Sequence, residues 1–359
     1  MTPLPTEKTV DHHRISQENA PPILVGIGAS AGGLQACKDL LAVLPPRCGM
    51  AFLIIQHQDP ARDSLLVELL AASSTMPVVD ARDGLLPERD HVYVGPSGSD
   101  VTLSRGHLKF VPRTRRVGPR GPIDRCLLDL ALAQGRDAAC IILSGTGQDG
   151  SAGAAAVRAA GGLVIAQSLD EAAFDAMPRA VLTSGVVDRL LAIRDMPAAL
   201  LDHGRARANS GPAAMPDEDA AIEIALPAFL ALLGASSARD LSAYKPGTLC
   251  RRIQHRMSGL GAVSVADYLD TLGSDPAECD ALRKDMLIHV TSFFRDPEVF
   301  DYLADEVLPG MIATLPDRGP LRAWIAGCSS GEEAYSFAIR LHEAIGKAGF
   351  APAAPVALI

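Results

Sequence analysis

The sequence predicts an α/β protein whose main part is a doubly wound, mostly parallel sheet with flanking helices. Apolar runs without polar alternation recur along residues 21–205, as expected of strands buried on both faces. Helical patterns separate several of these runs. Glycine-rich turns follow two of them, at residues 26–33 and 145–150. Beyond residue 218 the pattern changes to a small all-helical domain and then to a partial Rossmann-like domain.

The elements of the sheet can be assigned in chain order. Four apolar runs are predicted as buried strands: residues 23–25, 50–55, 138–143 and 161–167, the last of which should close the sheet. Three stretches carry helical patterns: residues 34–44, 64–72 and 123–134. Short strands are expected at residues 78–80 and 91–94, and a hairpin at residues 101–111.

The composition is that of a globular protein, with 48% hydrophobic and 21% charged residues among 359. A net charge of −9 argues against a nucleic-acid partner. Seven dispersed cysteines argue for a reducing compartment and against a metal site or a disulfide framework. No apolar run approaches the roughly 18 residues that span a bilayer, and residues 1–20 resemble a disordered tail rather than a signal peptide. We therefore expect a cytoplasmic protein without membrane insertion.

The stretch around Ser30 offers the first candidate for chemistry. Gly28-Ala29-Ser30-Ala31-Gly32 matches the G-x-S-x-G pattern that holds a nucleophilic serine on a strand-to-helix turn. The same glycines also fit a dinucleotide-binding turn, and this stretch alone leaves the two interpretations at even odds.

Two later turns favour the nucleophile. The second strand ends at His57, where a dinucleotide fold would place the Asp or Glu that binds ribose. Asp149 lies inside the second glycine-rich turn, where a carboxylate would repel phosphate but could orient a histidine. Carboxyl ends of neighbouring parallel strands face one crevice. The sequence thus predicts a catalytic triad of Ser30 as nucleophile, His57 as base and Asp149 as its orienting group.

Motifs at residues 26–33, 56–57, 143–150 and 176–179 resemble the catalytic domain of the chemotaxis methylesterases, the CheB family. The resemblance covers residues 21–205. It implies a serine hydrolase that removes γ-methyl esters from glutamates on the cytoplasmic helices of methyl-accepting chemoreceptors, releasing methanol. It also implies deamidation of certain glutamines, and no cofactor for the esterase.

The backbone N–H groups of Ala31 and Thr146 are expected to stabilise the oxyanion. Both positions depart from the family, which commonly has threonine at the first and often methionine at the second. The phospho-receiver domain usual in the family has no counterpart in residues 1–20.

Charged residues suggest two docking surfaces. A basic cluster in a Gly/Pro-rich loop is interpreted as a contact for an acidic protein substrate, with a solvated loop as the alternative: Arg113, Arg115, Arg116, Arg120 and Arg125. Residues 206–217 are predicted as a linker, and residues 218–288 as a helical receptor-docking domain. Within it, Arg252 and Arg256 share a helix face, which fits a docking surface and a solvated face equally well.

Residues 290–297, residues 321–335 and the helix at 245–257 resemble the chemotaxis receptor methyltransferases, the CheR family, which use S-adenosylmethionine. The resemblance implies cofactor contacts at Thr291, Arg295, Glu332 and Glu333, with Tyr335 nearby. Residues 289–359 are expected to form a truncated methyltransferase domain. The acidic residue that should follow its second strand is absent, so we expect no tight cofactor binding.

The sequence therefore favours a chemotaxis methylesterase. One alternative is a bifunctional methylesterase and protein-glutamate O-methyltransferase, and another is a non-catalytic receptor-binding scaffold. Methanol release separates catalysis from scaffolding, and methyl transfer separates the two enzymes.

Overall fold

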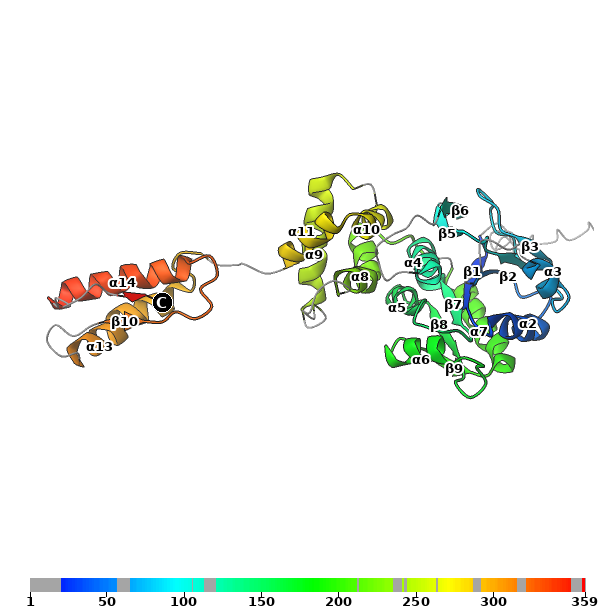
Figure 1. The fold of residues 1–359 in the computed structure, drawn as a ribbon, viewed down its shortest axis with the longest axis horizontal. Coiled ribbons are helices and arrows are strands. Elements are labelled where there is room, and N and C mark those ends of the chain that lie inside the picture. Colours follow the sequence, from blue (N-terminus) through cyan, green and yellow to red (C-terminus); the bar gives the residue numbers. More distant parts are fainter. Residues whose placement is uncertain are drawn as a thin grey trace, which may run out of the picture. The chain divides into compact units, whose positions relative to one another are not determined.

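The structure is a computed structural model that describes residues 21–56, 65–104, 106–112, 121–211, 213–234, 241, 244–262, 264–286, 292–314, 321–349 and 357–358. The predicted tail, residues 1–20, lies outside the described residues. The chain divides into two compact units, Met1–Lys284 and Asp285–Ile359 (Figure 1).

Seven parallel strands form the central sheet of the first unit, in the order β3-β4-β2-β1-β7-β8-β9. They are β1 (Ile23–Ala29), β2 (Met50–Gln56), β3 (Val78–Asp80), β4 (His91–Val94), β7 (Ala139–Ile142), β8 (Leu163–Gln167) and β9 (Arg189–Leu191). From β1 the chain first adds β2, β3 and β4 on one side of the sheet and then β7, β8 and β9 on the other. This order confirms the predicted doubly wound sheet.

Strand β9 corrects one expectation, because the sheet was expected to end at residues 161–167. Its three residues are exposed or half-exposed, so they carry no buried apolar run. An edge strand of this kind leaves little trace in a hydrophobicity pattern.

Helices cover both faces of the sheet: α2 (Gly33–Val43), α3 (Leu66–Ala71), α4 (Pro122–Gln134), α5 (Ser151–Ala159), α6 (Ala176–Thr183) and α7 (Met196–Ser210). Alternate residues of β1 point to opposite faces. Val25 and Ile27 join the buried cluster that includes Leu40 and Leu200 of α2 and α7. Gly26 and Gly28 instead leave room for side chains of α4.

A hairpin and two 3-10 turns complete the α/β part of the first unit. The hairpin β5 (Ser99–Ser104) and β6 (His107–Pro112) is antiparallel, as predicted. The 3-10 turns η1 (Gly135–Asp137) and η2 (Ile193–Asp195) precede β7 and α7. Helix α7 continues to Ser210, so the first five positions of the predicted linker at residues 206–217 are helical.

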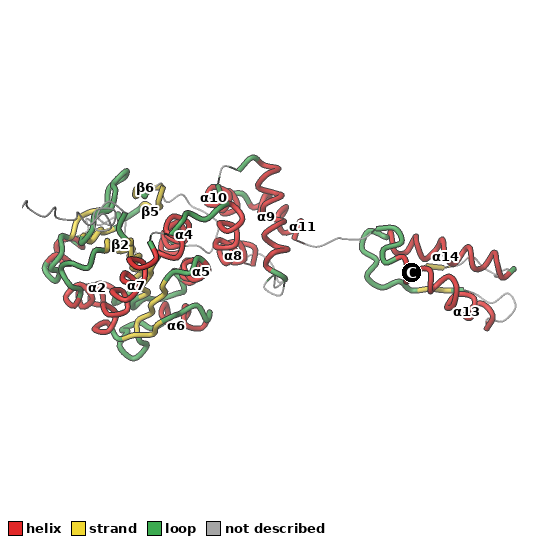
Figure 2. The backbone as a smooth tube through the Cα atoms, turned by 180° about the vertical axis from the view of Figure 1, so that it is seen from behind, coloured by secondary structure: helices red, strands yellow, loops and turns green. Residues whose placement is uncertain are grey.

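Four further helices follow, and the first compact unit ends within the last of them: α8 (Glu218–Gly234), α9 (Pro246–Leu260), α10 (Val265–Ser274) and α11 (Pro276–Met286). Helix α8 packs against α4 and α5 on one side and against α9 and α10 on the other (Figure 2). We call α8–α11 the helical domain.

The second unit contains α12 (Pro297–Tyr302), the π-helical turn η3 (Leu303–Val307), α13 (Leu308–Thr314), β10 (Arg322–Ala323), α14 (Glu332–Ala348) and β11 (Ala357–Leu358). Strands β10 and β11 pair in parallel, as in a partial Rossmann-like fold. Leu308, Ile312, Leu321 and Leu341 form its buried cluster with Ala344. Among the helices of the described residues, none is long and apolar enough to cross a membrane.

Candidate active site

Ser30 follows β1 directly, at the point where the winding of the sheet reverses. Its N–H donates to the carbonyl of Ser144 at 3.0 Å, and its carbonyl accepts from Gly33 N–H at 2.8 Å. Gly32 has φ 72°, and a Cβ on Gly33 would lie 2.6 Å from Cβ of Ala29. Glycine is therefore required where the chain turns sharply into α2. The strand, turn and helix expected around a nucleophilic serine are present.

The turn after β7 packs against this elbow. Ser144 is buried, donates from Oγ to the carbonyl of Ala31 at 2.9 Å, and accepts from Phe174 N–H at 3.0 Å. A Cβ on Gly145 would lie 3.0 Å from Cβ of Ser30 and 2.1 Å from Sδ of Met177. Thr146 comes next and is exposed. Ser144, which holds the Ala31–Gly32 peptide at the start of the turn, is not among the site residues predicted from the sequence.

Asp149 lies at the end of the same turn, where its carboxylate binds the first turn of α4. Oδ2 accepts from Ile123 N–H at 3.1 Å and Oδ1 from Asp124 N–H at 3.0 Å. A Cβ on Gly121 would lie 2.2 Å from this carboxylate, so that position has no room for a side chain. Ile123 also fills the space above Gly28, two residues before Ser30. One helix turn therefore ties Asp149 to the strand that carries Ser30.

The side chain of Asp124 in turn binds the first turn of α5, the helix that follows Asp149. Its carboxylate is 5% exposed and accepts from Gly153 N–H at 2.8 Å, at the start of α5. Asp149 thus accepts hydrogen bonds from the start of α4, and Asp124 of α4 accepts one from the start of α5, which follows Asp149. Burial, followed by the charge of Asp149, raises the pKa of Asp124 to about 7. Asp124 is not among the site residues predicted from the sequence, although a proline at the helix start and an acidic residue in the first turn are usual signals there.

His57 lies outside the described residues. The strand before it ends at Gln56, which is aligned with Ala29 in the parallel ladder. Gln56 lines a cavity of about 540 Å³ together with Ser30, Ala31 and Lys38. Among the described residues, no donor reaches the buried Oε1 of Gln56.

Comparisons with known protein families assign each of the three domains. The model of the CheB methylesterase family matches residues 25–200. The models of the CheR methyltransferase all-alpha domain and of its SAM binding domain match residues 224–287 and 289–352. The chain joins a CheB domain to CheR domains.

Two curated proteins and one solved structure are similar to parts of this chain. An uncharacterized 104.1 kDa protein of Rhodobacter capsulatus is 36% identical over 304 residues, which are 79% of this chain and 32% of that protein. A protein-glutamate methylesterase/protein-glutamine glutaminase of Anaeromyxobacter dehalogenans is 37% identical over 53% of this chain and 57% of its own length. The crystal structure of the Thermotoga maritima CheB methylesterase catalytic domain is 25% identical, with a TM-score of 0.46, over 51% of this chain and 99% of its own. The chain thus spans about a third to just over half of the two curated relatives.

The basic cluster predicted in the CheB domain needs a correction. Arg125 lies in α4 rather than in a loop, and its guanidinium pairs with Asp100 and Asp270. It is therefore not part of an open basic surface. The other four arginines of the cluster, at positions 113, 115, 116 and 120, lie outside the described residues.

Arg256 of the CheR all-alpha domain has a partner inside its own domain. Its guanidinium donates to both carboxylate oxygens of Glu278, at 2.6 and 2.8 Å, and Tyr268 donates to the same carboxylate at 2.8 Å. These hydrogen bonds lower the pKa of Glu278. Arg252 is half-buried one turn earlier on α9. The docking role of both arginines stays a prediction.

In the CheR SAM binding domain, a cavity of about 590 Å³ is lined by Arg295, Asp296, Gly327 and Glu333. Backbone at left-handed φ borders it, at Asp296 (φ 59°) and Gly327 (φ 78°). A cation, carboxylates and a glycine suit the amino-acid and ribose groups of S-adenosylmethionine. Glu332 does not line this cavity, and its carboxylate accepts from Ser330 Oγ at 2.7 Å. Tyr335 is exposed and packs near Phe293, and Thr291 lies outside the described residues.

Proposed function

We propose that this protein is a chemotaxis methylesterase that hydrolyses glutamate γ-methyl esters on chemoreceptor helices and releases methanol. One observation carries the proposal: Ser30 occupies a glycine-bound elbow packed against the turn that leads to Asp149. Deamidation of receptor glutamines is proposed alongside, since the same attack on a γ-amide releases ammonia. The relative from A. dehalogenans is named for both activities.

The mechanism follows from the residue types. His57 accepts the proton of Ser30 Oγ as this oxygen attacks the ester carbonyl. The N–H groups of Ala31 and Thr146 stabilise the oxyanion. His57 then protonates the departing methanol, and water activated by His57 releases the glutamate. Asp149 holds the imidazole in the productive tautomer.

The local hydrogen bonds support this assignment of roles. The carbonyl of Ser30 accepts from Gly33 N–H at 2.8 Å, so the Ser30–Ala31 peptide that carries the Ala31 N–H is held before substrate arrives. A fixed donor is worth more than a mobile one, because it needs no reorganisation during the reaction. Lys38, at the same cavity, places a cation where an acidic receptor segment would approach.

Methanol release from a methylated receptor tests the proposal. Ser30→Ala should lower turnover by roughly 10⁴- to 10⁶-fold. Ser168→Ala is the matched control, because this serine follows β8 and bonds its own neighbour Asp170. Release of methanol by Ser30→Ala at the wild-type rate would refute the assignment. Activity should also fall as the pH drops through about 6.5, where an ordinary imidazole becomes protonated.

A second proposal concerns the cavity of the CheR SAM binding domain. Arg295 and Glu333 are proposed to hold S-adenosylmethionine, which would supply an activated methyl group. The sequence instead predicts no tight binding, so the two expectations oppose each other. Calorimetric titration of the full chain with S-adenosylmethionine decides between them. Binding that is lost in Glu333→Gln supports the cavity, and no heat of binding supports the sequence prediction.

A further inference from the structure

The helical domain shares its core with the CheB domain through α8. Most apolar residues of α8 are buried: Ile222, Ile224, Ala225, Leu226, Ala228, Phe229, Leu232 and Leu233. One side faces α4 and α5, and Phe229 packs on the other side with Tyr268 of α10 at 5.9 Å between ring centroids.

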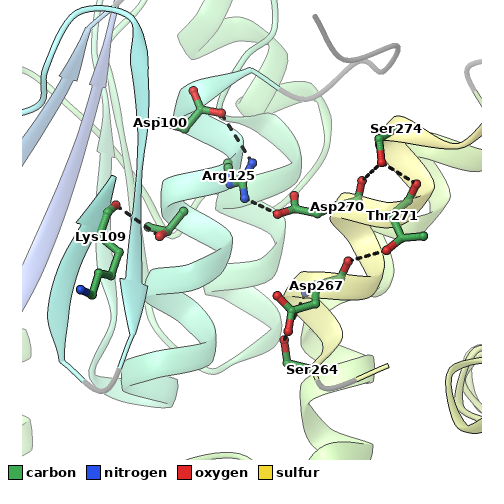
Figure 3. Close-up of polar contacts among 9 residues, drawn as sticks. Asp100, Lys109, Arg125, Ser264, Asp267, Asp270, Thr271 and Ser274 are labelled. Atoms are coloured by element: carbon green, nitrogen blue, oxygen red, sulfur yellow. Dashed lines mark hydrogen bonds and ion pairs between the residues drawn. The ribbon is translucent and has the colours of Figure 1, made fainter. Parts of the chain in front are cut away.

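Arg125 adds a charged contact to this interface. Figure 3 shows its guanidinium between Asp100 of β5 and Asp270 of α10. Nη1 lies 3.7 Å from Oδ2 of Asp100, and Nη2 donates to Oδ2 of Asp270. The side chains are 12%, 15% and 28% exposed for Arg125, Asp100 and Asp270. Removal of either aspartate would leave part of the shielded Arg125 charge without a counter-charge, which is costly. The two ion pairs therefore strongly favour one position of the Arg125 side chain.

The position of Arg125 in α4 links this contact to the candidate active site. Arg125 immediately follows Ile123 and Asp124, the residues whose N–H groups bind the carboxylate of Asp149. The first turn of α4 therefore holds Asp149 through its backbone and the helical domain through a side chain. Any movement of this turn changes both contacts.

We propose that the docked helical domain positions Asp149, because Asp270 acts through Arg125 to fix the first turn of α4. The inference rests on the proposed function only for the catalytic role of Asp149. Asp270 and Arg125 are positioning residues in this scheme, since neither needs to touch substrate. The helical domain would then tune the esterase as well as carry any receptor-docking surface.

Two measurements on the full chain test the proposal: backbone hydrogen exchange reports on the first turn of α4, and methanol release reports on the esterase. In Asp270→Asn the amides of Ile123 and Asp124 should exchange about 10-fold faster than in wild type. The kcat for a methylated receptor should fall about 3- to 10-fold with KM unchanged. Asp267→Asn is the matched control, because this carboxylate on the same helix accepts from Ser264 instead.

A charge exchange separates positioning from a general loss of stability. Asp270→Arg alone should be worse than Asp270→Asn, because it places two cations together. Combined with Arg125→Asp and Asp100→Asn, it restores one pair of opposite charges between α4 and α10 with no second carboxylate beside it, and both the exchange rates and kcat should return toward wild type.

Three results would overturn the proposal: wild-type exchange at Ile123 and Asp124 in Asp270→Asn, faster exchange without a change in kcat, or a change confined to KM. The last would assign the contact to receptor binding. If wild type itself releases no methanol, the proposed function fails. The exchange rates then still decide whether the helical domain fixes this turn.

Discussion

Replacement of Asp124 by asparagine tests the reciprocal capping in the CheB domain. Burial and the charge of Asp149 raise the pKa of Asp124 from 3.8 to about 7. Between these values the folded protein holds a proton that the unfolded chain has lost. The contribution of Asp124 to stability is therefore fully present below about pH 4 and is lost as the pH rises through about 7.

The full pKa difference corresponds to at most about 4 kcal/mol, and about 1 kcal/mol of it falls between about pH 6 and pH 8.5. This window lies above the sequence pI of about 5.5, where solubility is better. Asp124→Asn keeps an oxygen for the N–H of Gly153 but has no charge to titrate. The free energy of unfolding of wild type should thus fall by about 1 kcal/mol relative to the variant across the window.

Urea denaturation followed by far-ultraviolet circular dichroism measures this difference at each pH. The only tryptophan, Trp324, lies in the second unit, so its fluorescence provides an internal control. The fluorescence transition should have the same pH dependence in both proteins. A constant difference between the wild-type and variant stabilities, over the whole window, would refute the inferred pKa and the burial that causes it.

Four further substitutions follow from described contacts. Gly145→Ala should lower the free energy of unfolding by about 1–3 kcal/mol and reduce methanol release, because its Cβ meets Met177 and Ser30. Gly147→Ala has open space and should cost only about 1 kcal/mol from its φ of 84°; equal losses in denaturation would contradict this. Arg256→Gln should destabilise the helical domain by about 3 kcal/mol in denaturant titrations near neutral pH, with a smaller loss once acid protonates its carboxylate partner. Gln56→Met should reduce methanol release about 10-fold without lowering Tm, because this amide lines the cavity beside Ser30 and no donor among the described residues binds its buried Oε1; an unchanged rate would assign Gln56 to packing alone.

The sequence could predict the strands at the centre of the sheet because they are continuously apolar. Ile23–Ala29 and Met50–Gln56 are buried along nearly their whole length, so burial and pattern agree. Arg189–Leu191 could not be found in this way, because an exposed edge strand follows its neighbour's backbone rather than a hydrophobic pattern.

The surroundings of Ser30 were also predictable, since glycines mark backbone that must turn sharply. The burial of Asp124 was not, because the amides that bind its carboxylate come from the start of α5, far along the chain. Arg125 was placed in a loop for a similar reason. Nearby arginines suggested an open basic surface, whereas carboxylates distant in sequence bind this one side chain.

The two outermost strands of the sheet bear on how copies of this protein meet. β3 and β9 are only three residues long, and Asp80 and Arg189 are exposed on them. Continuous intermolecular sheets require long, uncharged borders with free amides and carbonyls. Self-association in concentrated solution should therefore proceed through helix surfaces, and aggregates of the native protein should not show cross-β spacing.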